Sequence, residues 1–344
     1  MAFDAASWPL HEHLLSRRNA LSILALGYPM TMAVTREWAW PGGGISAEAL
    51  GKLVPSLGQP SHDRLLRVLN DRRLRGQIPA REVEFILASE HRSLDELMIQ
   101  LLPIAQLRSH PPLSNYRVGI LARGTSGSLY LGANLEVPGQ CLGFAVHGEQ
   151  SAVANAFMHG DGGITAIALT AAPCGHCRQF LNELQNAKDL DVFIKGSVPT
   201  RLGALLPQAF GPDNLAVKER LFSGGTAEIR LTRAADDLAT AALEAASRSY
   251  APYTRAYSGI AARSSTGVVY QGSYLENAAF NPSLSPLQAA LVGVIMGGEQ
   301  PDDMRDAVLV ELENASISQL SATRAVLEAL APQVSLRRVA ARLK

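Results

Sequence analysis

The sequence is poor in cysteine, carries no net charge and has no long hydrophobic run. Its 344 residues include three cysteines, an odd and sparse set that does not fit a disulfide framework. Lys and Arg total 31, as do Asp and Glu, so no global field would gather phosphates or anionic membranes. We therefore expect neither nucleic acid nor membrane as a partner, although a local basic groove would escape this argument.

The N-terminal apolar stretch, residues 21–34, is too short for a membrane span, which needs about 20 residues. Ser16-Arg17-Arg18 precedes it, so a twin-arginine export signal is one interpretation. The alternative, which we favour, is a poorly ordered extension over residues 1–45 of a cytoplasmic protein. The remaining length, with 47% hydrophobic and 18% charged residues, allows two or three globular domains.

Residues 46–110 have a helical pattern. Apolar residues recur at three- and four-residue spacing over 61–74 and 79–89, and Ser93-Leu94-Asp95-Glu96 is a capping box that opens a third helix. The sequence predicts a small helical region that ends at Pro111-Pro112.

Strands and helices alternate after this region. Residues 117–123 and 128–133 predict a β-hairpin around the turn 124–127. A helix over 148–159, a strand over 164–170 and a helix that opens at Cys174 follow. This alternation predicts an α/β sandwich with helices on both faces of the sheet.

The chain also repeats itself at a constant offset of 140 residues. Residues 116–136 align without gaps on 256–276, and the shared residues include Gly119/Gly259, Ala122/Ala262, Gly127/Gly267, Tyr130/Tyr270, Gly132/Gly272 and Glu136/Glu276. A duplicated domain explains this best. We expect a first domain over 111–215, a linker near 211–232 and a second domain over 233–344.

The residues that carry chemistry lie between positions 147 and 177. Cys174 and Cys177, at i and i+3 on the first turn of a helix, project to one side, and the helix N-terminus favours their thiolates. His147 supplies a third ligand, which leaves the fourth zinc position to a water. Glu149 can reach that water without binding the metal and can carry its proton. Histidine-x-glutamate followed by proline-cysteine-x-x-cysteine is the known signature of zinc nucleobase deaminases.

Other interpretations of the cysteine pair explain less. A structural zinc site needs four ligands, and no other cysteine–histidine cluster supplies a fourth. A redox pair leaves His147 and Glu149 unexplained. His176, between the cysteines, should point away from the metal, and Cys141 fits a small core or loop residue.

His147-Gly148-Glu149-Gln150 and Pro173-Cys174-Gly175-His176-Cys177 resemble the two zinc motifs of cytidine deaminases. Gly132-Ala133-Asn134-Leu135-Glu136 resembles that family's nucleoside-binding segment, and Tyr250-Ala251-Pro252-Tyr253 another family hallmark. The match is strongest to the longer bacterial form, a homodimer with a degenerate second domain. The resemblance implies a duplicated cytidine-deaminase-like α/β/α sandwich with a mixed sheet.

The resemblance also implies roles for single residues. Zinc would bind His147, Cys174 and Cys177, and Glu149 would transfer protons. Asn134 and Glu136 would hold the sugar 3′-hydroxyl, with the Leu135 backbone between them. Tyr116 would stack on the pyrimidine, where the family usually has phenylalanine. Without the resemblance, Asn134 and Glu136 fit a solvated strand end equally well.

Two departures from the family pattern bear on the chemistry. Gly148 replaces the usual alanine, which we expect to be tolerable because the backbone there would face the base. In the second copy His147-Gly148-Glu149-Gln150 aligns on Ser285-Pro286-Leu287-Gln288, and no cysteine follows Cys177. We therefore expect one zinc ion per chain.

The sequence thus predicts hydrolytic deamination of cytidine and 2′-deoxycytidine in pyrimidine salvage. Two alternatives remain, a deaminase of another amino-heterocycle or of a polynucleotide base, and a non-catalytic zinc-stabilised binding module. The charge balance and the asparagine-x-glutamate segment speak against polynucleotide. Glu149 speaks against a purely structural site.

Overall fold

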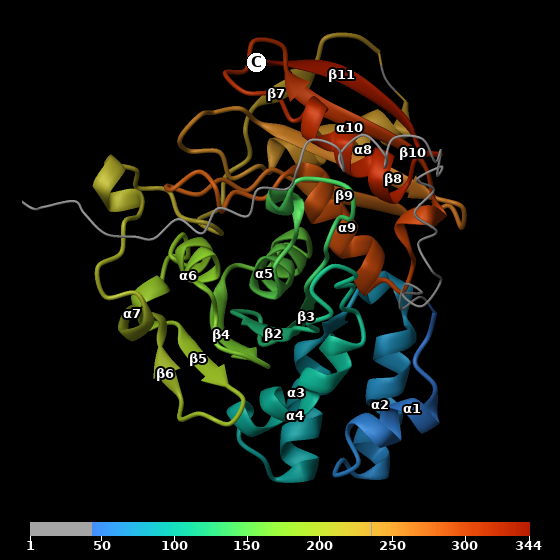
Figure 1. Ribbon diagram of the computed structural model, residues 1–344, viewed down its shortest axis with the longest axis vertical. Coiled ribbons are helices and arrows are strands. Elements are labelled where there is room, and N and C mark those ends of the chain that lie inside the picture. Colours follow the sequence, from blue (N-terminus) through green and yellow to red (C-terminus); the bar gives the residue numbers. More distant parts are fainter. Residues whose placement is uncertain (1–42, 235) are drawn as a thin grey trace, which may run out of the picture. The chain divides into compact units, whose positions relative to one another are not determined.

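The computed structural model describes residues 43–234 and 236–344 (Figure 1). The extension predicted for residues 1–45 lies almost wholly outside the described residues, as does Ser16-Arg17-Arg18. No helix among the described residues is long and apolar enough to cross a membrane.

The predicted helical region contains helices α1 (Ala47–Leu53), α2 (Gln59–Asn70), α3 (Ala80–Glu90) and α4 (Leu94–Gln106). The capping box is confirmed, because Ser93 accepts from the Glu96 amide and the Glu96 carboxylate accepts from the Ser93 amide at 2.9 Å. One element was not predicted. The two-residue strand β1 (Gln77–Ile78) pairs with a strand of the first sheet and joins this region to it.

The first sheet has the order β1-β3-β2-β4-β5-β6. Its other strands are β2 (Gly119–Gly124), β3 (Leu129–Ala133), β4 (Ile164–Leu169), β5 (Asp191–Ile194) and β6 (Thr200–Arg201). The β4–β5 pair is parallel and the other pairs are antiparallel, so the sheet is mixed as expected. Helices α5 (Gly148–Met158), α6 (Gly175–Leu181) and the short α7 (Leu202–Leu205) accompany it.

The second sheet repeats this pattern in the order β7-β11-β10-β8-β9. Its strands are β7 (Ile229–Leu231), β8 (Ser258–Ser264), β9 (Val269–Ser273), β10 (Met304–Leu312) and β11 (Ser335–Leu343), and its helices are α8 (Asp237–Ser247), α9 (Pro286–Met296) and α10 (Leu320–Leu330). The registers agree at the offset of 140, since Gly119 faces Ala133 as Gly259 faces Ser273. The duplication predicted from the sequence is confirmed.

Two pairs of repeated glycines let helices pack closely on the strands. A Cβ on Gly119 would lie 2.6 Å from the Gln106 nitrogen in α4, and one on Gly132 would lie 2.3 Å from the Ala152 nitrogen in α5. The two glycines point to opposite faces of the sheet, because Gly132 faces Ile120, the neighbour of Gly119. Gly259 and Gly272 make the corresponding approaches to α8 and α9. Helices therefore cover both faces.

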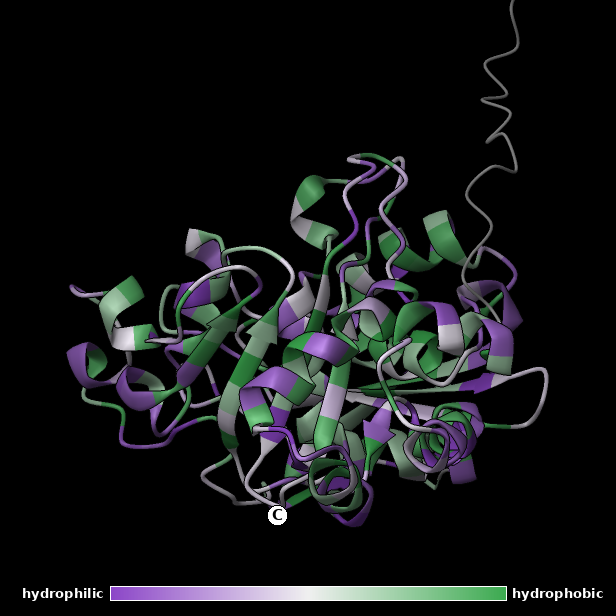
Figure 2. Cartoon of the chain, turned by 90° about the horizontal axis from the view of Figure 1, so that it is seen from below, coloured by the Kyte–Doolittle hydropathy of each residue, from purple (hydrophilic) through white to green (hydrophobic). Residues whose placement is uncertain are grey.

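The two copies share one hydrophobic core. Helices α5 and α9 pack against each other between the sheets (Figure 1). Both are buried on nearly every side, which explains why α9 is apolar all round. In Figure 2 hydrophobic residues fill the strands and central helices, whereas the outer helices carry more polar residues.

The structure adds detail to the division expected from the sequence. Helix α4, inside the predicted region 46–110, packs on β2 as α8 packs on β8, so the repeated unit begins before residue 111. Strand β7 lies inside the predicted linker 211–232 and already belongs to the second sheet. The domain limits 111–215 and 233–344 remain predictions.

Candidate active site

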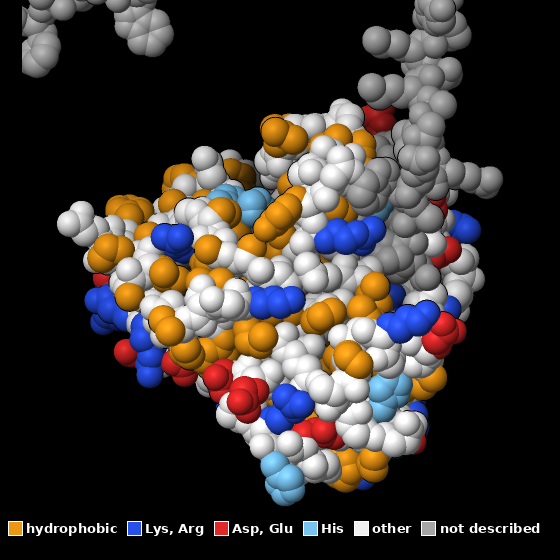
Figure 3. Space-filling view, turned by 60° about the horizontal axis from the view of Figure 1, so that its bottom comes forward, with side chains coloured by type: hydrophobic (Ala, Val, Ile, Leu, Met, Phe, Trp, Pro, Cys, Tyr) orange, Lys and Arg blue, Asp and Glu red, His pale blue; other side chains and the backbone are white. Residues whose placement is uncertain are grey.

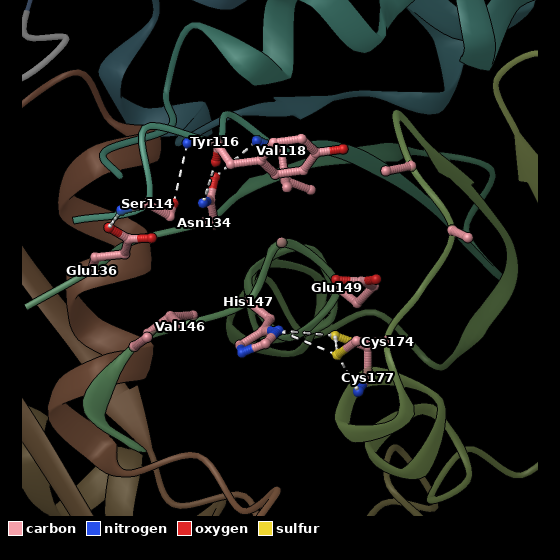
Figure 4. A pocket seen from close by; sticks show the side chains of 14 residues that line it. Ser114, Tyr116, Val118, Asn134, Glu136, Val146, His147, Glu149, Cys174 and Cys177 are labelled. Carbon is pink, nitrogen blue, oxygen red and sulfur yellow. Dashed lines mark hydrogen bonds between the residues drawn. The ribbon is translucent and has the colours of Figure 1, made fainter. Parts of the chain in front are cut away.

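The side chains of His147, Cys174 and Cys177 converge where α5 and α6 begin (Figure 4). His147 is the N-cap of α5, and Cys174 is the N-cap of α6, where its sulfur accepts from the Cys177 amide at 3.4 Å. The His147 Nδ1 atom lies 3.5 Å from the Cys174 sulfur and 3.3 Å from the Cys177 sulfur. The two sulfurs are 3.3 Å apart.

These separations are close to, and slightly shorter than, those between three ligands of one zinc ion. With Zn–S near 2.3 Å and Zn–N near 2.0–2.1 Å, tetrahedral ligands lie about 3.5–3.8 Å from one another. Two thiolates and an imidazole are also the donors that zinc prefers. Among residues 43–234 and 236–344, these three form the one such cluster of histidine, cysteine or acidic ligands.

The cluster stabilises negative charge on sulfur. Hydrogen bonds with Cys177 and His147 lower the pKa of Cys174 to about 3. The hydrogen bond with Cys174 raises the pKa of His147. The hydrogen bond with Cys174, followed by burial, raises the pKa of Cys177. A thiolate is the form of cysteine that binds a metal ion, so the lowered pKa of Cys174 favours metal binding here.

Glu149 lies in the first turn of α5, beside the cysteines (Figure 4). It is 5% exposed, and burial raises the pKa of its carboxyl group. Burial thus favours the neutral form of this carboxyl group, which is the direction in which enzymes commonly tune acid–base carboxyl groups.

His176 and Cys141 were not predicted to bind the metal, and neither belongs to the cluster of His147, Cys174 and Cys177. The ring of His176 stacks on that of His147 at 4.9 Å between centroids, so His176 packs against a predicted zinc ligand. Burial lowers the pKa of His176, which favours its neutral form. Cys141 is exposed in the loop before the short helix Leu142–Phe144.

A cavity of about 280 Å³ opens above the cluster. Its walls include four of the residues predicted to bind substrate or act on it, Tyr116, Asn134, Glu136 and Glu149. Tyr116 is 59% exposed at the rim. The pocket also includes Ser114, Val118, Ala145, Val146, Gly148, Ala171 and Ala172.

Asn134 and Glu136 both organise the loop that forms one wall. The Asn134 side chain accepts from the Val118 amide at 2.9 Å and from the Ser109 hydroxyl, and it donates to the Tyr116 carbonyl at 2.9 Å. The Glu136 Oε2 atom accepts from the amides of Leu113 at 2.7 Å and Ser114 at 3.0 Å.

Leu135 has a different surrounding from its two neighbours. Its amide and carbonyl both pair with Val146, and its side chain is buried. Leu135 therefore fixes the strand end from which Asn134 and Glu136 project, and it does not line the cavity. Sequence reasoning missed the buried Ser109, because a single serine in a loop carries no signal of its own.

The second copy keeps the scaffold of this site without its chemistry. Ser285 is the N-cap of α9 where His147 caps α5, and Leu287 takes the place of Glu149. Gln319 is the N-cap of α10 where Cys174 caps α6. The prediction that this copy cannot build the zinc site is consistent with these positions.

Two segments match the family described as the cytidine and deoxycytidylate deaminase zinc-binding region, residues 92–192 and 202–324. A protein named cytidine deaminase from Photobacterium profundum is 41% identical over 86% of this chain and 98% of its own length. One from Vibrio parahaemolyticus is 44% identical over 75% of this chain and 87% of its own length. The solved cytidine deaminase of Mycobacterium tuberculosis is 28% identical, covers 35% of this chain and 99% of its own, and has a TM-score of 0.32.

Proposed function

This chain belongs to the cytidine deaminase family, and we propose that it converts cytidine and 2′-deoxycytidine with water into uridine or 2′-deoxyuridine and ammonia. The observation that carries this proposal is the convergence of His147, Cys174 and Cys177 beside the buried Glu149, at one end of a cavity. Equal amounts of uridine and ammonia, formed from cytidine by the purified protein, would test it.

We propose that His147, Cys174 and Cys177 hold the zinc ion of this reaction. Zinc with three protein ligands lowers the pKa of a water in its fourth position to about 7 and so supplies the nucleophile. Glu149 would take one proton from the attacking water and pass it to the ring nitrogen, and would then take the second proton, from the hydroxyl left on the ring carbon, and give it to the leaving amine. The burial of its carboxyl group and the raised pKa which that burial causes support this role.

At the other end of the cavity Glu136 is suited to bind the sugar, and the second copy provides an internal comparison. Glu276 accepts from the Tyr253 and Thr254 amides just as Glu136 accepts from Leu113 and Ser114. The hydroxyl of Thr254 also donates to the second oxygen of Glu276. No described residue donates to the corresponding Oε1 atom of Glu136.

This difference supports a role for Glu136 Oε1 as acceptor of the sugar 3′-hydroxyl. Asn134 retains one amide hydrogen beyond the one given to Tyr116, and this hydrogen can donate to the same hydroxyl. Leu135 holds both residues at the strand end. Tyr116, at the rim, can stack on the pyrimidine while its hydroxyl stays in water.

A free nucleoside suits this site better than the alternatives. A polynucleotide needs basic contacts for its phosphates, whereas basic and acidic side chains are intermixed on the face shown in Figure 3. A purely structural zinc site has no use for a buried carboxyl group beside the ligands.

We also propose a homodimer, as the family resemblance implies. Leu113 near the cavity, and Leu142, Phe210 and Phe280 elsewhere, are large exposed apolar side chains that a second copy could cover. A cytoplasmic location in pyrimidine salvage is our expectation, and three cysteines without a disulfide fit a reducing compartment. Light scattering would give the mass of the assembly.

A further inference from the structure

Gln150 and Gln288 join the two copies by reciprocal hydrogen bonds. The Gln150 Nε2 atom donates to the Pro282 carbonyl in the second copy at 2.9 Å. The Gln288 Nε2 atom donates to the Phe144 carbonyl in the first copy at 3.0 Å. Gln150 is 2% exposed and Gln288 6% exposed, and they lie at the same position of the packed helices α5 and α9. The duplication has therefore produced a matched pair of contacts.

Only one member of this pair adjoins the zinc ligands. The Gln150 Oε1 atom accepts from the His147 amide at 3.1 Å, so a single buried amide connects His147 to the Pro282 carbonyl. The Gln288 Oε1 atom accepts the corresponding bond from the Ser285 amide. Ser285 stands at the position of His147 but is not a predicted zinc ligand.

The loop 277–282, which contains Pro282, also binds α6, the helix that begins after Cys174 and contains Cys177. The Asn277 Nδ2 atom donates to the Gln179 carbonyl in α6 at 2.9 Å, and the Gln179 side chain donates back at 3.3 Å. The Ala278 amide donates to Glu183 at 2.8 Å just beyond α6. Asn277 and Glu183 are both fully buried. Residues 277–282 thus contact both zinc-bearing helices.

We propose that the loop 277–282 of the second copy is a brace that holds α5 and α6 at the separation which zinc requires. The positioning residues are Gln150, which binds this loop from α5, and Asn277, which binds α6 from the loop. A degenerate copy without ligands then contributes directly to the metal site of its own chain. The consequence for turnover rests on the proposed function, whereas the consequence for zinc affinity does not.

The physical basis is that buried hydrogen bonds are directional and fix the backbone that carries the predicted ligands. Residues that orient metal ligands commonly change metal affinity by about 10–100-fold when they are replaced. Without Gln150, the His147 backbone loses its cap and its tie to the second copy. The Nδ1 atom is then free to drift from the sulfurs, and Glu149 drifts with it.

The test compares Gln150→Leu with Gln288→Leu, two substitutions of similar volume at equivalent buried positions. Zinc affinity is measured by chelator competition, next to kcat, KM and the thermal midpoint. We expect Gln150→Leu to lose about 10–100-fold in zinc affinity and to lower kcat. Gln288→Leu should lower the thermal midpoint similarly and leave zinc affinity unchanged, with any kinetic effect in KM through the wall near Phe144.

Asn277→Ala tests the same brace from the cysteine side and replaces Gln150→Leu if that variant does not fold. A loss of zinc affinity in it supports the proposal. Unchanged zinc affinity in Gln150→Leu and Asn277→Ala would overturn the proposal, as would an equal loss in Gln288→Leu. Chelator competition needs no substrate. If the variants change zinc affinity as expected but the wild type does not deaminate cytidine, the proposed function is refuted and the brace is not.

Discussion

A Cβ atom on Gly148 would lie 2.6 Å from the Cγ1 atom of Ile120, well inside van der Waals contact. Val118 approaches the same point to 3.0 Å. The sequence led us to expect that glycine in place of the family's usual alanine is tolerable, because the backbone here would face the base. Gly148 does line the cavity, and side chains from β2 and the residue before it occupy the space that an alanine side chain would need. The His147–Glu149 segment is thus seated directly on Ile120.

Gly148→Ala should therefore be harmful. An extra methyl group in a packed interior costs about 1–3 kcal/mol of folding free energy. Here it would also displace the ligand on one side and the acid–base group on the other. We expect a lower thermal midpoint and a lower kcat, and partial recovery in Gly148→Ala with Ile120→Ala. A Gly148→Ala protein with the thermal midpoint and kcat of the wild type would show that β2 shifts at no cost, and it would contradict this prediction.

The sugar contact predicts a specific substrate preference. Removing the 3′-hydroxyl leaves the polar groups of Glu136 and Asn134, which the bound nucleoside would cover, unpaired, at about 1–3 kcal/mol each. We expect kcat/KM on 3′-deoxycytidine to fall roughly ten- to a hundredfold or more, with 2′-deoxycytidine still a substrate. Glu136→Gln should lower kcat/KM on cytidine, and the matched Glu276→Gln should leave it unchanged. Equal efficiency on cytidine and 3′-deoxycytidine would refute this sugar site.

The sequence predicted what depends on neighbouring residues. The Ser93 capping box, the hairpin turn 124–127 and Cys174 at the start of α6 are encoded over a few positions. The sequence predicted that His147, Cys174 and Cys177 come together because their spacing is set by the helix ends that carry them. The repeat was visible because the strand glycines must admit helices in both copies.

Features that depend on distant partners were not predictable. The strand β1 has two residues, too few for any periodicity, and exists only because β3 offers it a partner. The loop-forming role of Asn134 depends on Ser109 and Val118, and the amide of Gln150 binds a carbonyl 132 residues away. A single sequence carries no sign of such pairings.

Metal content tests the degenerate second copy. We expect one zinc per chain, because Ser285 and Leu287 replace His147 and Glu149 and no cysteine follows Cys177. Chelation should lower the thermal midpoint, since the ion joins α5 to α6 in the folded state only. Elemental analysis of pure protein gives the ratio. Two zinc ions per chain would contradict the assignment of ligands.

Truncation after Thr232 tests whether the second copy is a separate module. Helix α9 packs on α5, and Tyr250 and Tyr253 donate to the fully buried Glu183 of the first copy. Loss of these contacts should expose a large apolar surface and leave a buried carboxylate without partners. We expect an aggregated or inactive fragment by size-exclusion chromatography and assay. A soluble and fully active fragment would show that the second copy is dispensable.

The most direct test of the account is the ultraviolet absorbance of cytidine, 2′-deoxycytidine, adenosine and guanine during incubation with zinc-loaded wild type and Glu149→Gln. We predict turnover of cytidine and 2′-deoxycytidine alone, with one ammonia released per uridine or 2′-deoxyuridine formed. Glu149→Gln should retain its zinc and lose roughly 10²–10⁴-fold or more in kcat. No change in cytidine with the wild type, or substantial turnover by a zinc-loaded Glu149→Gln protein, would contradict the account.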